Sequence, residues 1–230
     1  MANNFFKFRQ FTVFQDRCAM KVGTDGTLLG AWARGGDTIL DIGTGTGLIA
    51  LMLAQRYPQA QVKGIDIVSS AVEQARENVE ASPFRNIVIE EADAVMFANE
   101  GERYHSIVCN PPFYEGLACP DGLRNVARHT TLLSFRSLVE SVVRLLRDDG
   151  EFSVIVPFDC LSRLENEASL SGLFKTRQCS VRTTPGKSPR RFLLAFRKHP
   201  CELETEDGVV ELSPGVRSEW YQQLTKDFYL

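Results

Sequence analysis

The sequence predicts an α/β protein with a doubly wound, mainly parallel sheet of seven strands, helices on both faces and an antiparallel hairpin at the C-terminal end. Two observations predict this class. Short apolar segments alternate with segments of helical periodicity from residue 38 to residue 170, which is typical of a parallel sheet covered by helices. Two strand-like segments then follow one another across Pro185 and Gly186, which predicts an antiparallel pair.

Each expected strand is a short apolar segment that ends at a turn signal. The first carries Ile39 and Ile42 and runs directly into a glycine cluster. The fourth must stop at Pro111 and Pro112, because proline cannot donate a hydrogen bond to a neighbouring strand. The strands are expected at residues 38–42, 61–67, 87–89, 105–109, 152–156, 174–182 and 190–197.

The segments between these strands predict four helices. Ser70 and Glu73 have the spacing of a capping box at the start of the second helix. The third has the strongest amphipathic pattern, and Asp149 with Gly150 is expected to close it. The helices are expected at residues 48–55, 70–79, 135–146 and 161–170.

The composition favours one domain that spans residues 1–230. With 43% hydrophobic and 24% charged residues, the chain has enough apolar side chains for one substantial core, and no linker or repeat divides it. We find no export signal and no apolar run of about eighteen residues, so we expect a cytoplasmic monomer without a membrane partner. Six scattered cysteines without a C-x-x-C pair favour free thiols and no metal site.

Charge is unevenly distributed along the C-terminal part of the chain, although the net charge is only -3. Residues 168–201 contain no acid, whereas residues 202–230 carry seven acids and two basic residues. Such a basic strip can hold phosphates even on an acidic protein, because salt confines the field of a charge to about 8 to 10 Å. The alternative is a pair of strands with solvated ends. The basic strip consists of Lys175, Arg177, Arg182, Lys187, Arg190, Arg191, Arg197 and Lys198.

The segment 41–47 predicts a cofactor-binding turn between the first strand and the first helix. Its glycines are Gly43, Gly45 and Gly47. Turns of this kind let several nucleoside cofactors approach the backbone. Asp41 would repel a diphosphate, but it favours the ammonium and sulfonium groups of S-adenosylmethionine. Asp66 is placed to bind ribose hydroxyls in either case. We therefore expect S-adenosylmethionine as cofactor and S-adenosylhomocysteine as product. One alternative is a nicotinamide dehydrogenase. The other is that Asp41 and Asp66 only cap local backbone turns and bind no cofactor.

The residues Asn110, Pro111, Pro112 and Phe113 follow the fourth strand, at the edge of the sheet where a ligand is expected. An amino group on a purine is a poor nucleophile, because its lone pair is delocalised into the ring. The side-chain carbonyl of Asn110 and the backbone carbonyl of Pro111 can accept its two hydrogens and free the lone pair, while Phe113 stacks on the base. The alternative is that residues 110–113 form only a turn and take no part in catalysis.

Two other positions allow more than one interpretation. Asp93 either caps a short helix or reaches the adenine of the cofactor. The polar segment 115–131 is long for a loop and is expected to close over substrate. Within it, His129 is a candidate for positioning the base or a phosphate, although histidines in loops are more often merely exposed.

Taken together, these motifs resemble those of the class I methyltransferases and, more closely, the bacterial tRNA1(Val) (adenine(37)-N6)-methyltransferases. The turn 41–47 and the motif 110–113 carry the general likeness. The segments 8–14 and 18–32 make the likeness more specific, because they look like the N-terminal lid of that family. In this chain the lid corresponds to residues 1–36. The likeness covers about residues 5–200 and includes the hairpin residues 185–191. The acidic extension 202–230 has no counterpart in the pattern.

The resemblance implies a tRNA substrate, methylated at N6 of the adenine that follows the anticodon of a valine tRNA. It implies that Lys21, Thr24 and Asp25 lie near the methionine end of the cofactor. The full cofactor-binding set is then Lys21, Thr24, Asp25, Asp41, Gly43, Gly45, Gly47, Asp66, Ile67, Asp93, Ala94 and Asn110. The expected substrate-binding residues are Tyr114, Arg128, His129, Lys187, Arg190 and Arg191. A protein glutamine N5-methyltransferase and a cofactor-binding module without catalysis are the alternatives.

Overall fold

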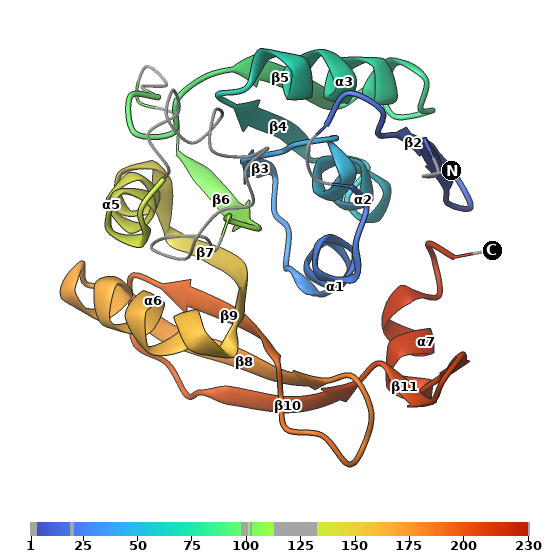
Figure 1. Ribbon diagram of the computed structural model, residues 1–230. Coiled ribbons are helices and arrows are strands. Elements are labelled where there is room, and N and C mark those ends of the chain that lie inside the picture. Colours follow the sequence, from blue (N-terminus) through green and yellow to red (C-terminus); the bar gives the residue numbers. More distant parts are fainter. Residues whose placement is uncertain (1–3, 19–20, 98–100, 102, 113–132, 230) are drawn as a thin grey trace, which may run out of the picture.

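The computed structural model describes residues 4–18, 21–97, 101, 103–112 and 133–229, which form a large sheet flanked by helices (Figure 1). The sheet has eight strands in the order β10-β8-β9-β7-β6-β3-β4-β5. The strands are β3 (Thr38–Ile42), β4 (Gln61–Asp66), β5 (Ile87–Glu91), β6 (Tyr104–Cys109), β7 (Leu146–Pro157), β8 (Phe174–Arg182), β9 (Arg191–Arg197) and β10 (Glu204–Val209).

The pairing of the strands confirms the predicted fold class. Strand β3 pairs in parallel with β4 and with β6, and the parallel order continues to β5 on one side and to β7 on the other. Strand β9 is antiparallel to both β7 and β8, which is the expected hairpin. The order of strands reverses between β3 and β6, so a ligand is expected beyond the carboxyl ends of these two strands.

Strand β10 is the element of the sheet that the sequence did not predict. It comes from the acidic extension and pairs in parallel with β8, so that Asp207 lies opposite Ser180 and Val209 opposite Arg182. The first four of its six residues are exposed. An edge strand of this kind needs backbone pairing but no apolar alternation, and its sequence therefore carries no strand signal.

Helices cover both faces of the sheet (Figure 1). On one face Leu51 packs with Ile39. On the other face Leu138 and Leu164 pack with Leu40. Successive residues of a strand point to opposite faces, which is why Ile39 and Leu40 belong to different cores. The helices are α1 (Thr24–Trp32), α2 (Leu48–Arg56), α3 (Ser69–Glu80), α5 (Phe135–Leu145), α6 (Phe158–Leu170) and α7 (Glu219–Thr225).

The predicted capping box of α3 is wrong. The residue before the helix is Val68, and no side chain caps the helix there. Instead, Asp66 reaches forward from the end of β4, and its Oδ1 accepts a hydrogen bond from the backbone N–H of Val68 at 3.0 Å. The helix thus starts one residue before Ser70, and its first turn is tied to a predicted cofactor residue.

The expected closure of α5 at Asp149 and Gly150 is also wrong. The helix ends at Leu145, and strand β7 begins at the next residue, so both positions lie inside the strand. Glycine is required at position 150 for a different reason. A Cβ there would stand 2.9 Å from the backbone carbonyl oxygen of His105, so the neighbouring strand approaches too closely for any side chain.

Helix α1 lies inside the expected lid 1–36 and was not predicted as a helix. Its residues from Gly26 to Trp32 are all buried, so it lacks the polar face that makes a helix visible in a sequence. Gly30 lets it approach α2 closely, because a Cβ at this position would come within 2.7 Å of the sulfur of Met52. This helix is therefore part of the core.

The two ends of the chain lie near one another on the same side of the molecule (Figure 1). The backbone N–H of Arg9, between strands β1 (Phe5–Lys7) and β2 (Thr12–Phe14), donates to the carbonyl of Phe228 at 2.8 Å. Phe8 and Phe228 are both almost fully buried. A small antiparallel pair, β11 (Glu211–Ser213) and β12 (Val216–Arg217), connects β10 to α7. The acidic extension is therefore an integral part of the fold.

Candidate active site

The turn 41–47 has the geometry of a ligand cradle. Its three glycines adopt positive φ angles of 70°, 55° and 80°, which other residues rarely adopt. A Cβ at Gly43 would meet no atom within 4 Å, and one at Gly45 would meet only the carbonyl of Gly43 at 4.0 Å. Gly47 differs, because it packs against Ala75 of α3. The first two glycines therefore leave the backbone open to a ligand, and the third seats the helix that follows.

Asp41 lies beneath this turn and is fully buried. Its Oδ2 accepts a hydrogen bond from the hydroxyl of Thr44 at 2.7 Å, whereas its Oδ1 is buried and has no hydrogen-bond partner among the described residues. Burial raises the pKa of Asp41 to about 7, because the charged carboxylate is deprived of water. Asp41 therefore caps the following turn, which was the alternative to a role in cofactor binding.

Asp66 holds the cradle from the neighbouring strand. Its Oδ2 accepts the backbone N–H of Gly45 at 2.9 Å, and its Oδ1 accepts that of Val68. A carboxylate has about four acceptor positions, so two remain for ribose hydroxyls. Ile67, the next residue, is exposed and offers an apolar surface at the same edge.

Asp93 caps a short turn after β5, which was one of its two expected roles. Its Oδ1 accepts the backbone N–H of Val95 at 2.8 Å, and its carbonyl accepts those of Met96 and Phe97. Ala94 is buried within this turn. The guanidinium of Arg144 in α5 donates to the carbonyls of Ala94 and Val95 at 3.2 and 3.0 Å, so the turn is also held from outside.

Asn110 stands at the end of β6, on the strand next to β3. Its Oδ1 is buried and has no hydrogen-bond partner among the described residues, like the Oδ1 of Asp41. Asp41 pairs with Val108 in the sheet, so Asp41 and Asn110 lie on the same face, two residues apart along neighbouring strands. Pro111 is buried and Pro112 is exposed. Phe113, Tyr114, Arg128 and His129 lie outside the described residues.

The buried Oδ1 of Asn110, which has no partner among the described residues, fits a ligand that carries hydrogen-bond donors. Leaving a buried acceptor without a donor costs about 1–3 kcal/mol, so native proteins rarely keep one without a use. The open glycine backbone and the free acceptor positions of Asp66 lie along the same edge of the sheet. These residues match the ammonium, the sulfonium and the ribose of S-adenosylmethionine better than the diphosphate of a dinucleotide.

Helix α1 and the residues before it carry the predicted lid residues Lys21, Thr24 and Asp25. Lys21 and Thr24 are exposed. Asp25, in the first turn of α1, forms an ion pair of 2.7 Å with the guanidinium of Arg191 at the start of β9. Arg191 was expected to bind substrate. In the structure it also anchors the lid to the hairpin, which the sequence could not indicate because the two residues lie 166 positions apart.

The basic strip is largely neutralised within the molecule. Six of its eight basic residues form ion pairs with acids from other elements, including Arg182 with Asp207 of β10. Lys187 and Arg190 are exposed and have no ion pair among the described residues. Only these two cations of the strip are therefore free, in the described structure, to meet a polyanion.

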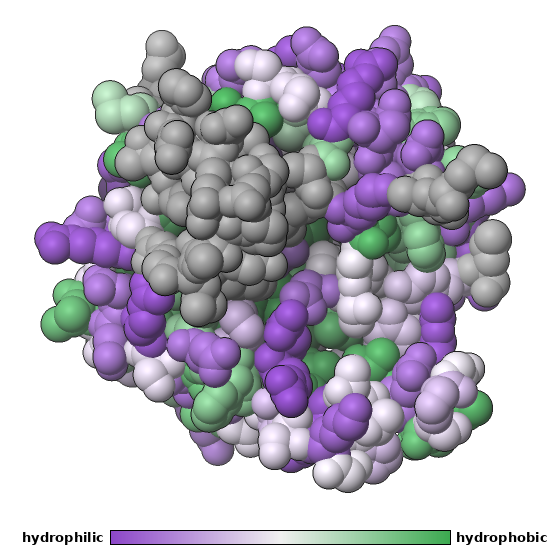
Figure 2. Space-filling view, in the orientation of Figure 1, coloured by the Kyte–Doolittle hydropathy of each residue, from purple (hydrophilic) through white to green (hydrophobic). Residues whose placement is uncertain are grey.

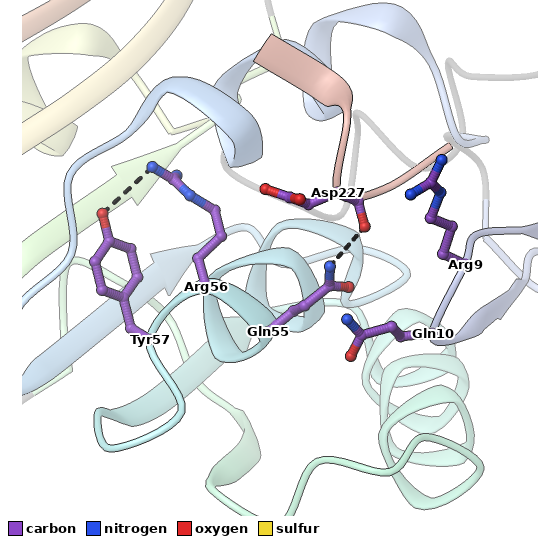
Figure 3. Close-up of a pocket in the computed structure, with 6 residues that line it drawn as sticks. All are labelled: Arg9, Gln10, Gln55, Arg56, Tyr57 and Asp227. Carbon is purple, nitrogen blue, oxygen red and sulfur yellow. Dashed lines mark hydrogen bonds between the residues drawn. The ribbon is translucent and has the colours of Figure 1, made fainter. Parts of the chain in front are cut away.

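A separate hollow of about 510 Å³ lies at the opposite edge of the sheet (Figure 3). It is lined by Arg9, Gln10, Gln55, Arg56, Tyr57 and Asp227. Gln55 donates to the carbonyl of Asp227 at 2.8 Å, and Arg56 donates to the carbonyls of Gly30 and Ala33. These contacts join the C-terminal end of α2 to the C-terminal segment of the chain and to the C-terminal end of α1.

Several general features of the described residues bear on the site. The five described cysteines form no disulfide, and no cluster of acids, histidines and cysteines in the described ranges could hold a metal ion. Among the residues described, none of the helices combines the length and the apolar character that crossing a membrane requires. On the face shown in Figure 2, hydrophilic residues predominate among those coloured, and hydrophobic residues are visible in a recess near the centre and in smaller patches along the rim.

Comparison with known proteins defines the class. The family model of the methyltransferase small domain matches residues 27–184. A predicted O-methyltransferase from Agrobacterium tumefaciens is similar in structure, with a TM-score of 0.67 and 20% identity over 89% of this chain and 96% of that one. A glycopeptide N-methyltransferase, whose structure was solved with S-adenosylmethionine, has a TM-score of 0.57 and 13% identity. The match covers 78% of this chain and 90% of that one. The chain therefore belongs to the methyltransferases that use S-adenosylmethionine.

Three curated relatives narrow the assignment, and each bears the name tRNA1(Val) (adenine(37)-N6)-methyltransferase. The protein from Phocaeicola vulgatus is 49% identical over 100% of this chain and 99% of its own length. Those from Trichodesmium erythraeum and Histophilus somni are 44% and 41% identical, again over nearly the whole of both chains. The chain belongs to the family of tRNA1(Val) (adenine(37)-N6)-methyltransferases.

Proposed function

We propose that this protein transfers the methyl group of S-adenosylmethionine to N6 of adenine 37 in tRNA1(Val). The observation that carries this proposal is the buried Oδ1 of Asn110, which no other described residue pairs, at the carboxyl end of β6, beside the open glycine turn. The names of the full-length relatives support the same reaction and the same substrate. Binding of tRNA also explains why two cations of the hairpin remain free.

The acceptors of the chain activate the adenine amine. The Oδ1 of Asn110 and the backbone carbonyl of Pro111 each accept one hydrogen of the amino group, which lets the nitrogen become pyramidal and frees its lone pair. The cofactor supplies an electrophilic methyl group on a sulfonium. The ammonium formed on the base is acidic and loses its proton to water, so no strong base is needed. Most of the acceleration comes from alignment of the reacting atoms.

The remaining residues hold the cofactor. Asp66 accepts hydrogen bonds from the ribose, and the turn of Asp93 and Ala94 faces the adenine end. Lys21, Thr24 and Asp25 close the methionine end from the lid. We assign Phe113, with Tyr114, Arg128 and His129, to the target base and its surroundings. We further propose that residues 1–230 act as one domain, because β2 and α7, near the two chain ends, pack against α3 and α1 of the main fold. We also propose that the protein is a monomer in the cytoplasm.

The variant Asn110→Ala tests this assignment. Removal of the acceptor should abolish methyl transfer to unmodified tRNA, because the amine then keeps its delocalised lone pair. The affinity for S-adenosylmethionine, measured by calorimetry, should change by about twofold or less, because the glycine turn and Asp66 remain. The variant Asn110→Asp keeps an acceptor oxygen at the same place and should retain measurable turnover.

Two outcomes would contradict the proposal. Turnover of Asn110→Ala at the wild-type rate would show that this side chain does not act on the amine. Methyl label from the wild-type protein that appears in a release factor and not in tRNA would favour a protein glutamine N5-methyltransferase instead.

A further inference from the structure

Phe158 is an exposed aromatic residue at the edge of the sheet that carries the site. It is the first residue of α6, it directly follows the end of β7, and it is 63% exposed. Strands β6 and β7 are parallel neighbours, with Cys109 opposite Val154. Phe158 therefore lies at the same carboxyl edge as Asn110. The two differ by about three residues along the strand direction, or about 10 Å at about 3.3 Å per residue.

The ring of Phe158 is held in place on one side and open on the other. It packs against Phe192 of β9, with ring centroids 6.2 Å apart and planes at 40°. Phe192 is almost fully buried, so it provides a fixed base. The backbone N–H of Phe158 donates to the carbonyl of Arg190 at 3.2 Å, which extends the pairing of β7 with β9. The exposed side of the ring thus has a defined position.

The two free cations of the basic strip lie at the same edge. Arg190 is tied to Phe158 through its carbonyl, and Lys187 lies in the turn before it, where its N–H donates to the carbonyl of Thr184. Another exposed ring, Phe174, begins β8 at the opposite edge and is 45% exposed. The cation next to it, Lys175, is paired with Glu165. An open ring beside free cations is thus found at Phe158 and not at Phe174.

We propose that Phe158 stacks on an unpaired base next to the target adenine, while Lys187 and Arg190 hold phosphates of the same RNA strand. This inference rests on the proposed function. Single-stranded RNA is recognised in this way, by aromatic rings that stack on splayed bases and by cations that follow the backbone. A protein partner fits less well, because the surface beside the ring offers two cations for a polyanion.

Methylation kinetics of variants at position 158 test this proposal. Phe158→Ala should raise the KM for unmodified tRNA about tenfold, because loss of one stacked base typically costs that much. Phe158→Leu should resemble it, since leucine is apolar but cannot stack, and Phe158→Trp should restore the wild-type value. Phe174→Ala, which removes an exposed ring from the opposite edge, should leave the KM unchanged. Thermal unfolding and the affinity for S-adenosylmethionine should be the same in all variants.

A fluorescent base provides a second measurement. A 2-aminopurine placed beside the target adenine should be quenched when wild-type protein or Phe158→Trp binds, but not when Phe158→Ala binds. A KM for Phe158→Ala within twofold of that for Phe174→Ala, with equal quenching, would overturn the stacking role while the function stands. Absence of methyl transfer to tRNA by the wild-type protein would instead overturn the proposed function itself.

Discussion

Asp41 and Asn110 show how much of a site residue can be predicted from its sequence neighbours. Both were expected at the site, because an acid before a glycine turn and an asparagine before two prolines carry local signals. Their surroundings were not predictable. Asp41 lies beneath its turn and binds Thr44, rather than standing open to a cofactor. The burial of Asp41 depends on helices and strands that are distant in sequence, so the local sequence pattern could not predict it.

The titration of Asp41 leads to a prediction about stability. In the folded protein its pKa is about 7, well above the usual value near 4, so folding takes up a proton between these two values. Raising the pH from about 4.5 to about 7.5 should therefore lower the free energy of unfolding of the cofactor-free protein by about 3 kcal/mol through this group alone. Urea unfolding of wild type and of Asp41→Asn measures this contribution.

The asparagine variant is a matched control, because it keeps an acceptor for the hydroxyl of Thr44 but cannot titrate. Its free energy of unfolding, relative to that of the wild type, should increase as the pH rises through this window. A constant difference between the two proteins from pH 4.5 to pH 7.5 would show that Asp41 is ionised in the folded state and that its burial is relieved by water.

At the scale of elements, the sequence predicted the helices and strands whose hydrophobic pattern reflects which of their residues are buried. The seven expected strands are present because each is apolar or alternating, and because prolines and glycines mark their ends. Helix α1 escaped prediction since it is buried on all sides after its first turn. Strand β10 escaped it for the opposite reason, because its first four residues are charged or polar and exposed. Neither pattern has a helical or strand period to detect.

The hairpin of β8 and β9 yields a prediction about RNA affinity. Lys187 and Arg190 carry the free charges of this element, so reversal of both to glutamate should weaken tRNA binding by about tenfold or more at physiological salt. The slope of log affinity against log salt should also become shallower by about 2, because two phosphate contacts are lost. Filter binding with unmodified tRNA at several salt concentrations measures both quantities.

Reversal of Lys7 and Lys226 is the matched control for net charge. Both are exposed, and both lie near the chain ends, away from the carboxyl edge. This control should leave the salt slope unchanged. If both double variants weaken binding equally, then the overall charge of the molecule, and not the hairpin, governs its affinity for RNA.

At the scale of the whole molecule, the sequence showed where positive charge is dense but not where it is free. The basic strip is continuous in sequence, yet the fold brings acids from several other elements to six of its members. Asp25, Glu151, Glu165 and Asp207 are four of these acids, and they lie far apart in the chain. The acidic extension, which the resemblance seen in the sequence left unassigned, supplies Asp207. Charge patterns predict partners only after the tertiary pairing is known.

The central claim is that the adenine amine, held by Asn110 and Pro111, receives the methyl group. Its most direct test is mass spectrometry of nucleosides from unmodified tRNA1(Val), incubated with the protein and with S-adenosylmethionine that carries a deuterated methyl group. The account predicts deuterated N6-methyladenosine in a fragment that contains the anticodon loop. Deuterium on a ring nitrogen of adenine, or no deuterium in the RNA at all, would contradict it.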